Sequence, residues 1–417
     1  MTGEFRKLWI GQSISAVGSQ VTLIALPLTA AFSLGSTPQE MGFLVAAQWL
    51  PYPVFGLFAG AWADRLRRKP ILIATDIGRA LVLATIPIAA LAGALTIGHV
   101  LVAAFAATSL TVLFRAAYSP FIPVLVPRDV LVDANAKLAL SESVARVAGP
   151  SLGGVLVQLV TAPITILIDA VSFVISAVAL VLVRATESPP PRTARRAIWA
   201  EMGEGMRVVI GNAFIRSVTI IGSIFNLAIT IGDAVLILYF TRELGLDGAM
   251  VGALYTIGGL ASVAGATLVR RVTGRFGIGP SMAGAIFLFV VGQTLILVAS
   301  GPPLVATVYL AGRGVLVAFG AAVFNVSSAS LYQAAVPIQL QGRVGGAGQV
   351  LGLGLIPVAA IAGGWLGEHI GLWNTIAIST AGQVLGLIYV ASSPLRAIRT
   401  PDDLPPIAAA QGGELPA

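Results

Sequence analysis

The sequence predicts an all-helical integral membrane protein with twelve transmembrane helices in two parallel repeats of six. Three observations lead to this fold class. Of the 417 residues, 57% are hydrophobic and 10% are charged, and the mean hydropathy is +0.92, which is typical of a chain in a lipid bilayer. Long apolar runs recur along the chain. The longest polar connection divides these runs into two equal sets.

Twelve apolar runs reach about 20 residues, the length that a helix needs to cross roughly 30 Å of hydrocarbon. The expected spans cover approximately residues 8–34, 41–63, 71–95, 98–124, 138–161, 163–183, 214–240, 248–270, 279–299, 303–331, 343–366 and 369–391. The first run is longer than the roughly 7 to 15 apolar residues of a signal peptide, so we expect it to be retained as a span.

Basic residues gather in the connections on one side of the membrane. The connections before the odd-numbered spans hold Arg6, Lys7, Arg65, Arg67, Arg68, Lys69, Arg128, Arg192, Arg195, Arg196, Arg207, Arg275 and Arg343. The connections on the other side hold only Arg242. By the positive-inside rule we expect a multi-pass protein of the plasma (inner) membrane with both termini in the cytoplasm. Topology thus explains the net charge of +7, and we expect no nucleic-acid partner.

The central connection defines the expected domains. They are an N-terminal six-helix bundle (1–184), a cytoplasmic central loop (185–213), a C-terminal six-helix bundle (214–392) and a disordered cytoplasmic tail (393–417). Because six is even, both halves enter the membrane in the same direction, which is the parallel-repeat arrangement of one class of transporters.

An internal duplication is also visible in the residues themselves. A shift of 210 positions places Arg65 on Arg275, Pro70 on Pro280, Pro127 on Pro337, and Gly153-Gly154 on Gly363-Gly364. The agreement of loop punctuation and span order supports a repeat more strongly than the identities alone.

Several kinds of chemistry are excluded or disfavoured by what the sequence lacks. It has no cysteine, so it has no disulfide and no thiolate site, and its two histidines lie far apart. It contains no GxxxxGK[ST] string for ATP binding. We therefore expect no metal, no cofactor and no enzymatic activity.

One charged stretch, GAWADRLRRKP from Gly60 to Pro70, follows the second span directly. Its Gly, Ala-Asp-Arg and basic cluster resemble the signature loop of the major facilitator superfamily, although Arg67 stands where that pattern usually has a second Gly. The resemblance implies the major facilitator fold for this chain.

The same resemblance implies a conformational latch on the cytoplasmic side. In it, Asp64 would pack against the start of span eleven, where a helix N-terminus favours negative charge. The expected latch residues are Asp64, Arg65, Arg68 and Lys69, facing Gly342 and Arg343. The alternative is a basic loop that only fixes topology, with its bases neutralising the acid at the anionic leaflet.

A longer segment, from Phe114 to Val157, is similar to the branch that contains enterobactin exporters and macrolide efflux proteins. It holds the elements Val-Pro-Arg-Asp, Ala-Asn-Ala and Gly-Pro-x-x-Gly-Gly in that order. In the resembled family the last element is the exporter-type packing motif, here Gly149, Pro150, Gly153 and Gly154. Small residues of this kind also mediate ordinary close packing of helices.

Charged residues within spans are costly, about 2.5 to 3.5 kcal/mol each on insertion scales, unless they face a cavity or a partner. Asp76 and Arg79 are three residues apart, and Glu142 and Arg146 are four apart. Both spacings place the two charges on one helix face, which predicts local ion pairs. Handling of protons by these acids is the alternative.

Four charged residues in spans have no such neighbour: Arg115, Asp169, Asp233 and Arg313. In the resembled fold, spans one, four, seven and ten line the cavity, which makes Arg115, Asp233 and Arg313 candidate cavity residues. Asp169 is a candidate for an outer gate or for packing. Neutral polar groups on cavity-type spans are Gln12, Gln20, Tyr118, Asn226 and Asn325; for each of these, hydrogen bonding between helices is the alternative role.

These observations predict a secondary active transporter that exports amphipathic organic compounds, such as drugs, macrolides or siderophores, by alternating access. A proton gradient is the expected energy source and the expected state is monomeric. The candidate coupling carboxylates are Asp233, Glu142, Asp169 and Asp76, with Asp233 ranked first. The alternatives are a uniporter or importer of a small metabolite, and a non-transporting membrane scaffold or sensor.

Overall fold

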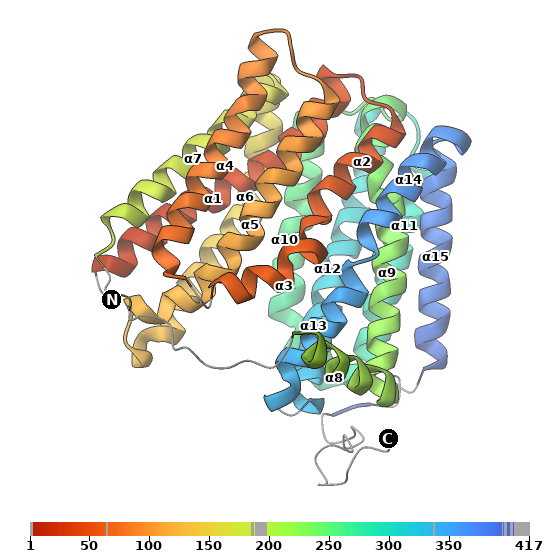
Figure 1. Cartoon of the computed structure of the whole chain (residues 1–417). Helices are drawn as coiled ribbons and strands as arrows, with labels where there is room; N and C mark the ends of the chain where they lie inside the picture. The colour runs from red at the N-terminus through yellow and green to blue at the C-terminus, as the bar shows by residue number, and fades with distance from the viewer. Residues whose placement is uncertain are drawn as a thin grey trace. The chain divides into compact units, whose positions relative to one another are not determined.

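The computed structural model describes residues 3–63, 66–184, 187, 198–336, 338–393, 395, 398–400 and 403. The regular elements in this part of the chain are all helical (Figure 1). Within the same part, ten helices are long and apolar enough to cross a membrane. The all-helical prediction is confirmed, and the chain has the fold of two parallel six-helix repeats.

The described residues of the N-terminal half form seven α-helices and two short turns. Their bounds are α1 Gly3–Leu28, continued by the π-helical turn η1 Thr29–Ser33, then α2 Pro38–Trp49, α3 Pro51–Ala63, α4 Arg68–Leu91, α5 Ile97–Leu125, the 3-10 turn η2 Arg128–Val130, α6 Leu131–Leu159 and α7 Ala162–Leu182. The expected second span is divided into α2 and α3, because Pro51 has no N–H to continue the helix at Leu50.

The described C-terminal half has the same sequence of spans, preceded by one additional helix and with its breaks at different places. Its helices are α8 Ile198–Gly211, α9 Ala213–Leu238 with the π-helical turn η3 Tyr239–Glu243, α10 Gly248–Phe276, α11 Ile278–Val298, α12 Pro303–Ala335, α13 Ile338–Leu353, α14 Ile356–Ile370 and α15 Leu372–Ser392. The expected eleventh span is likewise divided, here into α13 and α14.

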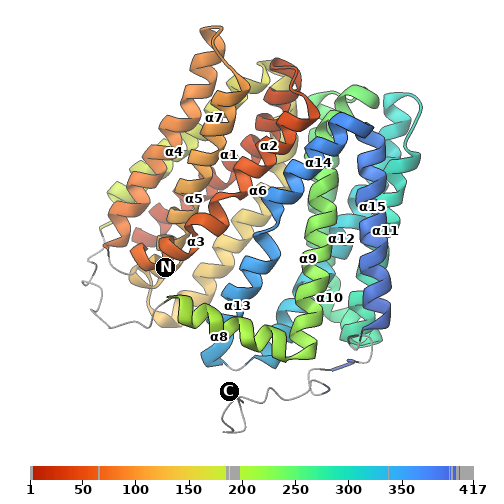
Figure 2. The ribbon, with the colours of Figure 1, turned by 45° about the vertical axis from the view of Figure 1, so that its right-hand side comes forward.

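The expected central loop contains a helix, α8, which the sequence analysis did not predict. Val209 of α8 is buried in the hydrophobic core of this half, together with Phe214 and Ile215 at the start of α9. The helix packs against α13, as Figure 2 also shows. The segment is amphipathic although it is rich in charged residues. Its apolar face packs against the core of this half.

The backbone confirms the shift of 210 residues between the halves. In η1, Leu34 N–H donates to Thr29 O at 3.2 Å, and in η3 Leu244 N–H donates to Tyr239 O at 3.1 Å. Gly35 and Gly245 follow these turns with φ of 61° and 65°, which only glycine adopts without strain. The same rare turn therefore ends the first helix of each repeat.

The described tail residues are also ordered in part. Ile278 N–H donates to Arg399 O at 3.1 Å and Gly279 N–H donates to Ile398 O at 2.7 Å, so the tail satisfies the first free N–H groups of α11. Ile398 and Arg399 thus contact the start of α11 through their backbone carbonyls. The rest of the expected tail lies almost entirely outside the described residues.

The helices form two compact units that do not coincide with the two halves of the sequence. The first unit contains Met1–Thr193, Ala234–Gly259 and Ala360–Leu372. The second contains Ala194–Asp233, Leu260–Ala359 and Trp373–Ala417. One end of α10 and the end of α14 thus belong to the same unit as the N-terminal helices.

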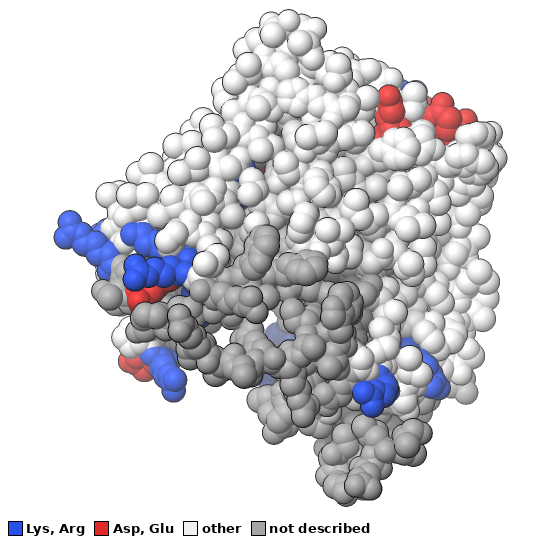
Figure 3. Space-filling model, viewed as in Figure 1, with Lys and Arg blue, Asp and Glu red and all other residues white. Residues whose placement is uncertain are grey.

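Charge is distributed over the surface as a membrane protein requires. On the face drawn in Figure 3, most Lys, Arg, Asp and Glu atoms lie near the ends of the helices, and the white surface of the other described residues covers most of the part between them. Large apolar side chains project from this part of the helices, among them Leu81 and Ile88 of α4 at 65% and 64% exposure. Such a surface is stable in contact with lipid tails.

Candidate functional site

The first group of functional candidates is a buried ion pair on α4. Asp76 is fully buried and Arg79 nearly so, and the two side chains form the salt bridge that their spacing predicts. Ser176 of α7 donates its hydroxyl to Asp76 Oδ2 at 2.6 Å. Gln12 of α1 donates to Ser176 Oγ at 2.7 Å. Three helices are thus joined by one polar chain.

Aromatic rings enclose the guanidinium of Arg79 on two sides. Its Cζ atom lies 4.4 Å from the ring centroid of Phe114 on α5 and 4.0 Å from that of Phe173 on α7. The negative ring faces attract the cation while excluding water. Its Nε has no hydrogen-bond partner in the described part of the chain.

Asp169 of α7 joins the same buried cluster, which the sequence did not reveal. The residue is 2% exposed, and its Oδ1 accepts hydrogen bonds from Ser172 at 3.1 Å and from Ser19 of α1 at 3.4 Å. It also attracts Arg79 electrostatically. Gly18 permits this approach of α1, because a Cβ there would lie 2.7 Å from Asp169 Oδ1.

Other candidates of the N-terminal half lie at more open positions. Arg115 of α5 is exposed, and Tyr118, one turn further, stacks on Phe114 at 5.3 Å between ring centroids. Glu142 and Arg146 of α6 lie 4.0 Å apart, with side chains that are 65% and 61% exposed. This second predicted pair is therefore loose, and its acid is accessible.

In the second unit, Asp233 has a basic partner on another helix. Asp233 is exposed in α9, and Arg313 of α12 attracts its carboxylate electrostatically. Arg313 Nε also donates to Gln293 Oε1 of α11 at 2.7 Å, so the guanidinium is held in place.

The two candidate asparagines of this half differ. Asn226 of α9 donates to the carbonyl of Gly352 at 3.3 Å, which matches the alternative role of linking helices. Asn325 of α12 is exposed. Of the two, Asn325 thus has the more accessible amide.

The exporter-type packing motif on α6 contacts two different helices. A Cβ on Gly149 would press on Gln20, and one on Gly153 would lie 3.1 Å from Val21 O, both on α1. Gly154 instead faces α10, where a Cβ would lie 3.0 Å from Gly252 Cα. The motif therefore packs α6 simultaneously on its own bundle and on α10.

A second contact of the same kind joins α2 and α14. A Cβ on Gly42 would lie 2.9 Å from Gly364 Cα and 2.6 Å from Ala360 O. A Cβ on Gly252 would lie 3.1 Å from Gly154 Cα and 2.5 Å from Pro150 O. We call these two contacts, Gly42 with Gly364 and Gly154 with Gly252, the outer seam, because they lie toward the helix ends predicted to face away from the cytoplasm.

The outer seam is symmetric under the shift of 210 residues. Gly252 lies 210 positions after Gly42, and Gly364 lies 210 positions after Gly154. In each contact, a glycine of one repeat therefore meets the counterpart of the other seam glycine in the second repeat: Gly42 meets the counterpart of Gly154, and Gly154 meets the counterpart of Gly42. Hydrogen bonds accompany it: Ser151 and Thr256 hydroxyls meet at 2.6 Å, and Arg242 donates to Ser36 O at 2.7 Å.

The expected latch lies only partly within the described structure. Asp64 and Arg65 lie outside the described residues, as do the side chains of Gly342 and Arg343. Arg68 Nη1 donates to Pro120 O at the end of α5 at 3.0 Å. Lys69 Nζ donates to Val183 O after α7 at 2.7 Å. These two bases thus neutralise the carbonyl ends of neighbouring helices.

Glu187 completes this arrangement, although the sequence analysis did not single it out. Its Oε2 accepts from Arg68 N–H at 2.7 Å and its Oε1 accepts from Lys69 N–H at 2.8 Å. The carboxylate therefore caps the first turn of α4, where free N–H groups and the helix dipole favour negative charge. The only hint in the sequence was an acid near the start of a connection rich in Arg and Glu.

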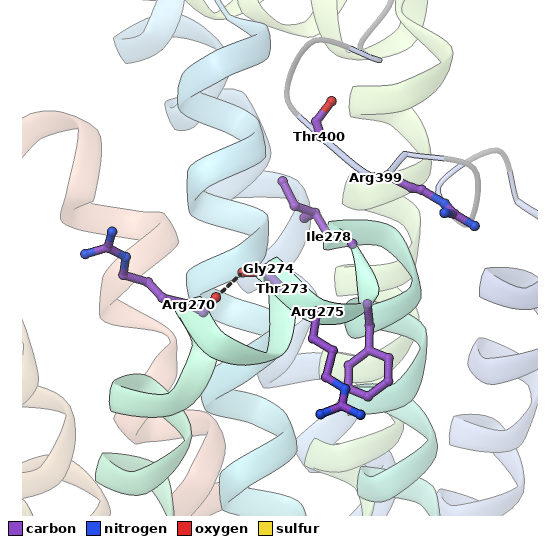
Figure 4. A pocket seen from close by; sticks show the side chains of 9 residues that line it. Arg270, Thr273, Gly274, Arg275, Ile278, Arg399 and Thr400 are labelled. Atoms are coloured by element: carbon purple, nitrogen blue, oxygen red, sulfur yellow. Dashed lines mark hydrogen bonds between the residues drawn. The ribbon is translucent and has the colours of Figure 1, made fainter.

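A shallow basic pocket lies beside the α10–α11 connection (Figure 4). Its arginines, Arg270, Arg275 and Arg399, point in different directions and do not converge on one point. Nearby, the backbone N–H groups of Thr400 and Arg399 donate to Asp403 and hold the pKa of this carboxyl below its usual value. In the described residues no three His, Cys, Asp or Glu side chains are placed to bind a metal ion.

Comparisons with known proteins agree with this architecture. The family model of the Major Facilitator Superfamily matches residues 8–360. An uncharacterized MFS-type transporter of Bacillus subtilis (strain 168) is 26% identical over 91% of this chain and 90% of its own length. The multidrug efflux pump Tap of Mycolicibacterium fortuitum is 26% identical over 92% of this chain and 94% of its own.

The predicted likeness to macrolide efflux proteins is confirmed over a shorter region. Macrolide efflux protein A of Streptococcus pyogenes is 25% identical over 53% of this chain and 55% of its own length. Solved structures show the same fold. A bacterial homologue of the iron transporter ferroportin in an inward-facing state has a TM-score of 0.74 at 15% identity, covering 94% of this chain and 99% of its own. The nucleoside transporter NupG has a TM-score of 0.74 at 13% identity, covering 94% of this chain and 99% of its own.

Proposed function

Because this chain belongs to the Major Facilitator Superfamily, a family of membrane transporters and not of enzymes, we propose that it is a proton-coupled exporter of amphipathic organic compounds. It works by alternating access in the plasma membrane, as a monomer with both termini in the cytoplasm. The export direction is supported by the two relatives named for efflux. The positive-inside distribution of basic residues supports the orientation.

The observation that carries the proposal is the exposed carboxylate of Asp233 within α9. A carboxylate that faced lipid at this depth would cost several kcal/mol, so we infer that the side chain faces space that water reaches during the transport cycle. Arg313 supplies a positive charge close to it. A carboxylate and a guanidinium in water-accessible space within a span suit a site where protonation and substrate binding compete.

The outer seam supports the alternating-access part of the proposal. Its glycines bring helix backbones into direct contact with few polar links, and such dry small-residue contacts form and separate without unpairing backbone groups. Alternating access requires them to separate when the outer side opens. On the opposite side, the expected Asp64 latch would close when the seam is open.

Transport in proteoliposomes tests the proposal. The purified protein is reconstituted with a pH gradient of either sign, and uptake of a fluorescent amphipathic cation and of a macrolide is measured. Accumulation against the concentration gradient, driven by opposite proton flow and abolished by a protonophore, supports the proposal. Flux that only equilibrates the probe identifies a uniporter, and accumulation along with the proton flow identifies an importer. Absence of flux for all probes in a growth-inhibition panel and in vesicles would favour the scaffold or sensor.

A further inference from the structure

The buried cluster of α1, α4 and α7 has an unequal number of acids and bases. Asp76 and Asp169 contribute two carboxyl groups, whereas Arg79 contributes one guanidinium, and these three residues are at most 5% exposed. A net charge enclosed by transmembrane helices is strongly unfavourable unless a proton removes it. The cluster is neutral only when one carboxyl group is protonated.

We propose that this cluster is a proton-binding site and that Asp169 holds the proton at neutral pH. The site is distinct from Asp233, which lies in the other compact unit. Its protonation follows from the packing of the cluster alone. Its use in driving transport rests on the proposed function.

The hydrogen bonds decide which acid holds the proton. Asp76 is salt-bridged to Arg79 and accepts a hydrogen bond from the Ser176 hydroxyl, so a cation and a hydroxyl donor both stabilise its ionised form. Among the described residues, the Asp169 carboxyl has neutral hydroxyl neighbours, and its Oδ1 accepts from Ser172 and Ser19. Such groups stabilise a carboxylate less than a cation does.

A hydroxyl group that could accept the proton of Asp169 lies beside it. The Thr22 hydroxyl on α1 is buried beside the Asp169 carboxyl, and in the described structure it has no hydrogen-bond partner apart from this carboxyl group. The protonated Asp169 would thus donate a hydrogen bond to the Thr22 oxygen. An ionised Asp169 could only accept one from the Thr22 hydroxyl.

The other charges around Asp169 do not balance it. On α4 only Asp76 and Arg79 lie inside the bundle, since Arg68 and Lys69 start the helix. On α5, Arg115 is exposed and lies outside the buried cluster. The described charges of α1 lie in its first two turns, η1 has none, and those of α6 are exposed: Asp133, Lys137, Glu142 and Arg146. Among the described residues of the packed helices, no further buried base remains to pair with Asp169.

Release of the proton requires α1 to move away from α7. Asp169 would then pass from the carboxylic acid to the carboxylate, with the proton going to water. Arg79 has a free Nε donor with which it can pair with a second carboxylate. Gly18 and Ser19 line the contact that would open, so the cluster links proton exchange to a movement of the first helix.

Infrared spectroscopy tests the protonation directly, without a transport assay. The carbonyl stretch of a protonated carboxyl group is recorded at neutral pH in lipid nanodiscs for wild type, Asp169→Asn, Ser172→Ala and Asp133→Asn. We expect a band that Asp169→Asn removes, Ser172→Ala shifts through loss of a hydrogen bond, and Asp133→Asn, an exposed acid on α6, leaves unchanged. A spectrum with no band sensitive to either cluster variant would overturn the proposal.

Charge-balance variants provide a second test through stability. Asn resembles a protonated Asp, so Asp169→Asn and Asp76→Asn each leave one acid and one base and should remain folded. The double variant leaves Arg79 alone and should lower the melting temperature by more than the two single changes added together. Wild type should lose stability in alkaline buffer more steeply than Asp169→Asn does. Additive losses, or identical alkaline profiles, would show that the cluster binds no proton. This result would stand whether or not the protein exports amphipathic compounds.

Discussion

The backbones of Gly154 on α6 and Gly252 on α10 lie in direct contact, and neither position leaves room for a Cβ atom without a shift. The pair Gly42 and Gly364 repeats this contact between α2 and α14 at positions related by 210 residues. A duplication thus produced two equivalent helix contacts from one pair of small-residue positions. We expect these contacts to be made and broken together during transport, because the symmetry gives them the same geometry.

Substitution of Gly252 by Ala should open the outer seam. The added methyl group would lie 2.5 Å from Pro150 O and 3.1 Å from Gly154 Cα, so α6 and α10 must separate. We expect transport to fall at least tenfold. Since the chain has no cysteine, Ser151→Cys and Thr256→Cys can be introduced directly to measure the closure. The disulfide between these two cysteines should form readily when residue 252 is the native glycine and poorly in the Gly252→Ala variant.

The matched control for the seam is Gly284→Ala. Gly284 lies in α11, where a Cβ would meet nothing within 4 Å. Its substitution should improve the intrinsic helix propensity without changing cross-linking or transport. Equal losses in the two alanine variants would mean that the effect comes from glycine content and not from the seam.

Asp233 and Arg313 should be required for uphill transport. Asp233→Asn removes the exchangeable proton, so accumulation driven by a pH gradient should disappear while downhill exchange or substrate binding stays measurable. Arg313→Lys keeps the positive charge near Asp233 and should retain more coupling than Arg313→Gln. The measurement is gradient-driven uptake in proteoliposomes, with Asp247→Asn, an acid in the η3–α10 connection, as the control. Full accumulation by Asp233→Asn would exclude it as a coupling residue and leave Asp169, Asp76 and Glu142.

The sequence predicted the helices well but not their partners across the bundle. Apolar length located the spans, and local spacing predicted the Asp76–Arg79 pair, because both depend on residues close in the chain. The attraction between Asp169 and Arg79 depends on how α4 and α7 are rotated toward each other, and no local pattern encodes this. For the same reason the sequence did not predict that Arg313 lies near Asp233. Asp233 has no basic residue within one helical turn, and Arg313 comes from another helix.

Helix α8 and the two π-helical turns were missed for other reasons. Helix α8 stands in a connection rich in Arg and Glu, and only the burial of Val209 against the core reveals its apolar face. The π-helical turns η1 and η3 leave no compositional signal at all. The residue that follows each of them, Gly35 or Gly245, was one glycine among 47.

Neutralising Asp64 should shift the protein toward the inward-open state. The residue ends the second span beside a basic cluster, and Asp64→Asn removes its charge with little change of shape. If it latches to span eleven, distances across the cytoplasmic side should lengthen in spin-label measurements and turnover should fall. Unchanged distances would leave the bases of this loop with a topological role alone.

Glu187 should stabilise the N-terminal bundle by capping α4. Both carboxylate oxygens accept backbone N–H groups of the first turn, from Arg68 and Lys69, so Glu187→Gln keeps one acceptor and loses the charge that favours this helix end. We expect a loss of about 1 kcal/mol in unfolding free energy, the usual value of a helix cap. Thermal unfolding in detergent measures it, with Glu142→Gln, an exposed acid on α6, as the matched control. The loss should shrink at high salt, because the capping charge is only partly buried and is open to screening. If Glu187→Gln and Glu142→Gln unfold at the same temperature, the carboxylate does not hold the start of α4, and the neighbouring bases must position this loop through the carbonyls of Pro120 and Val183.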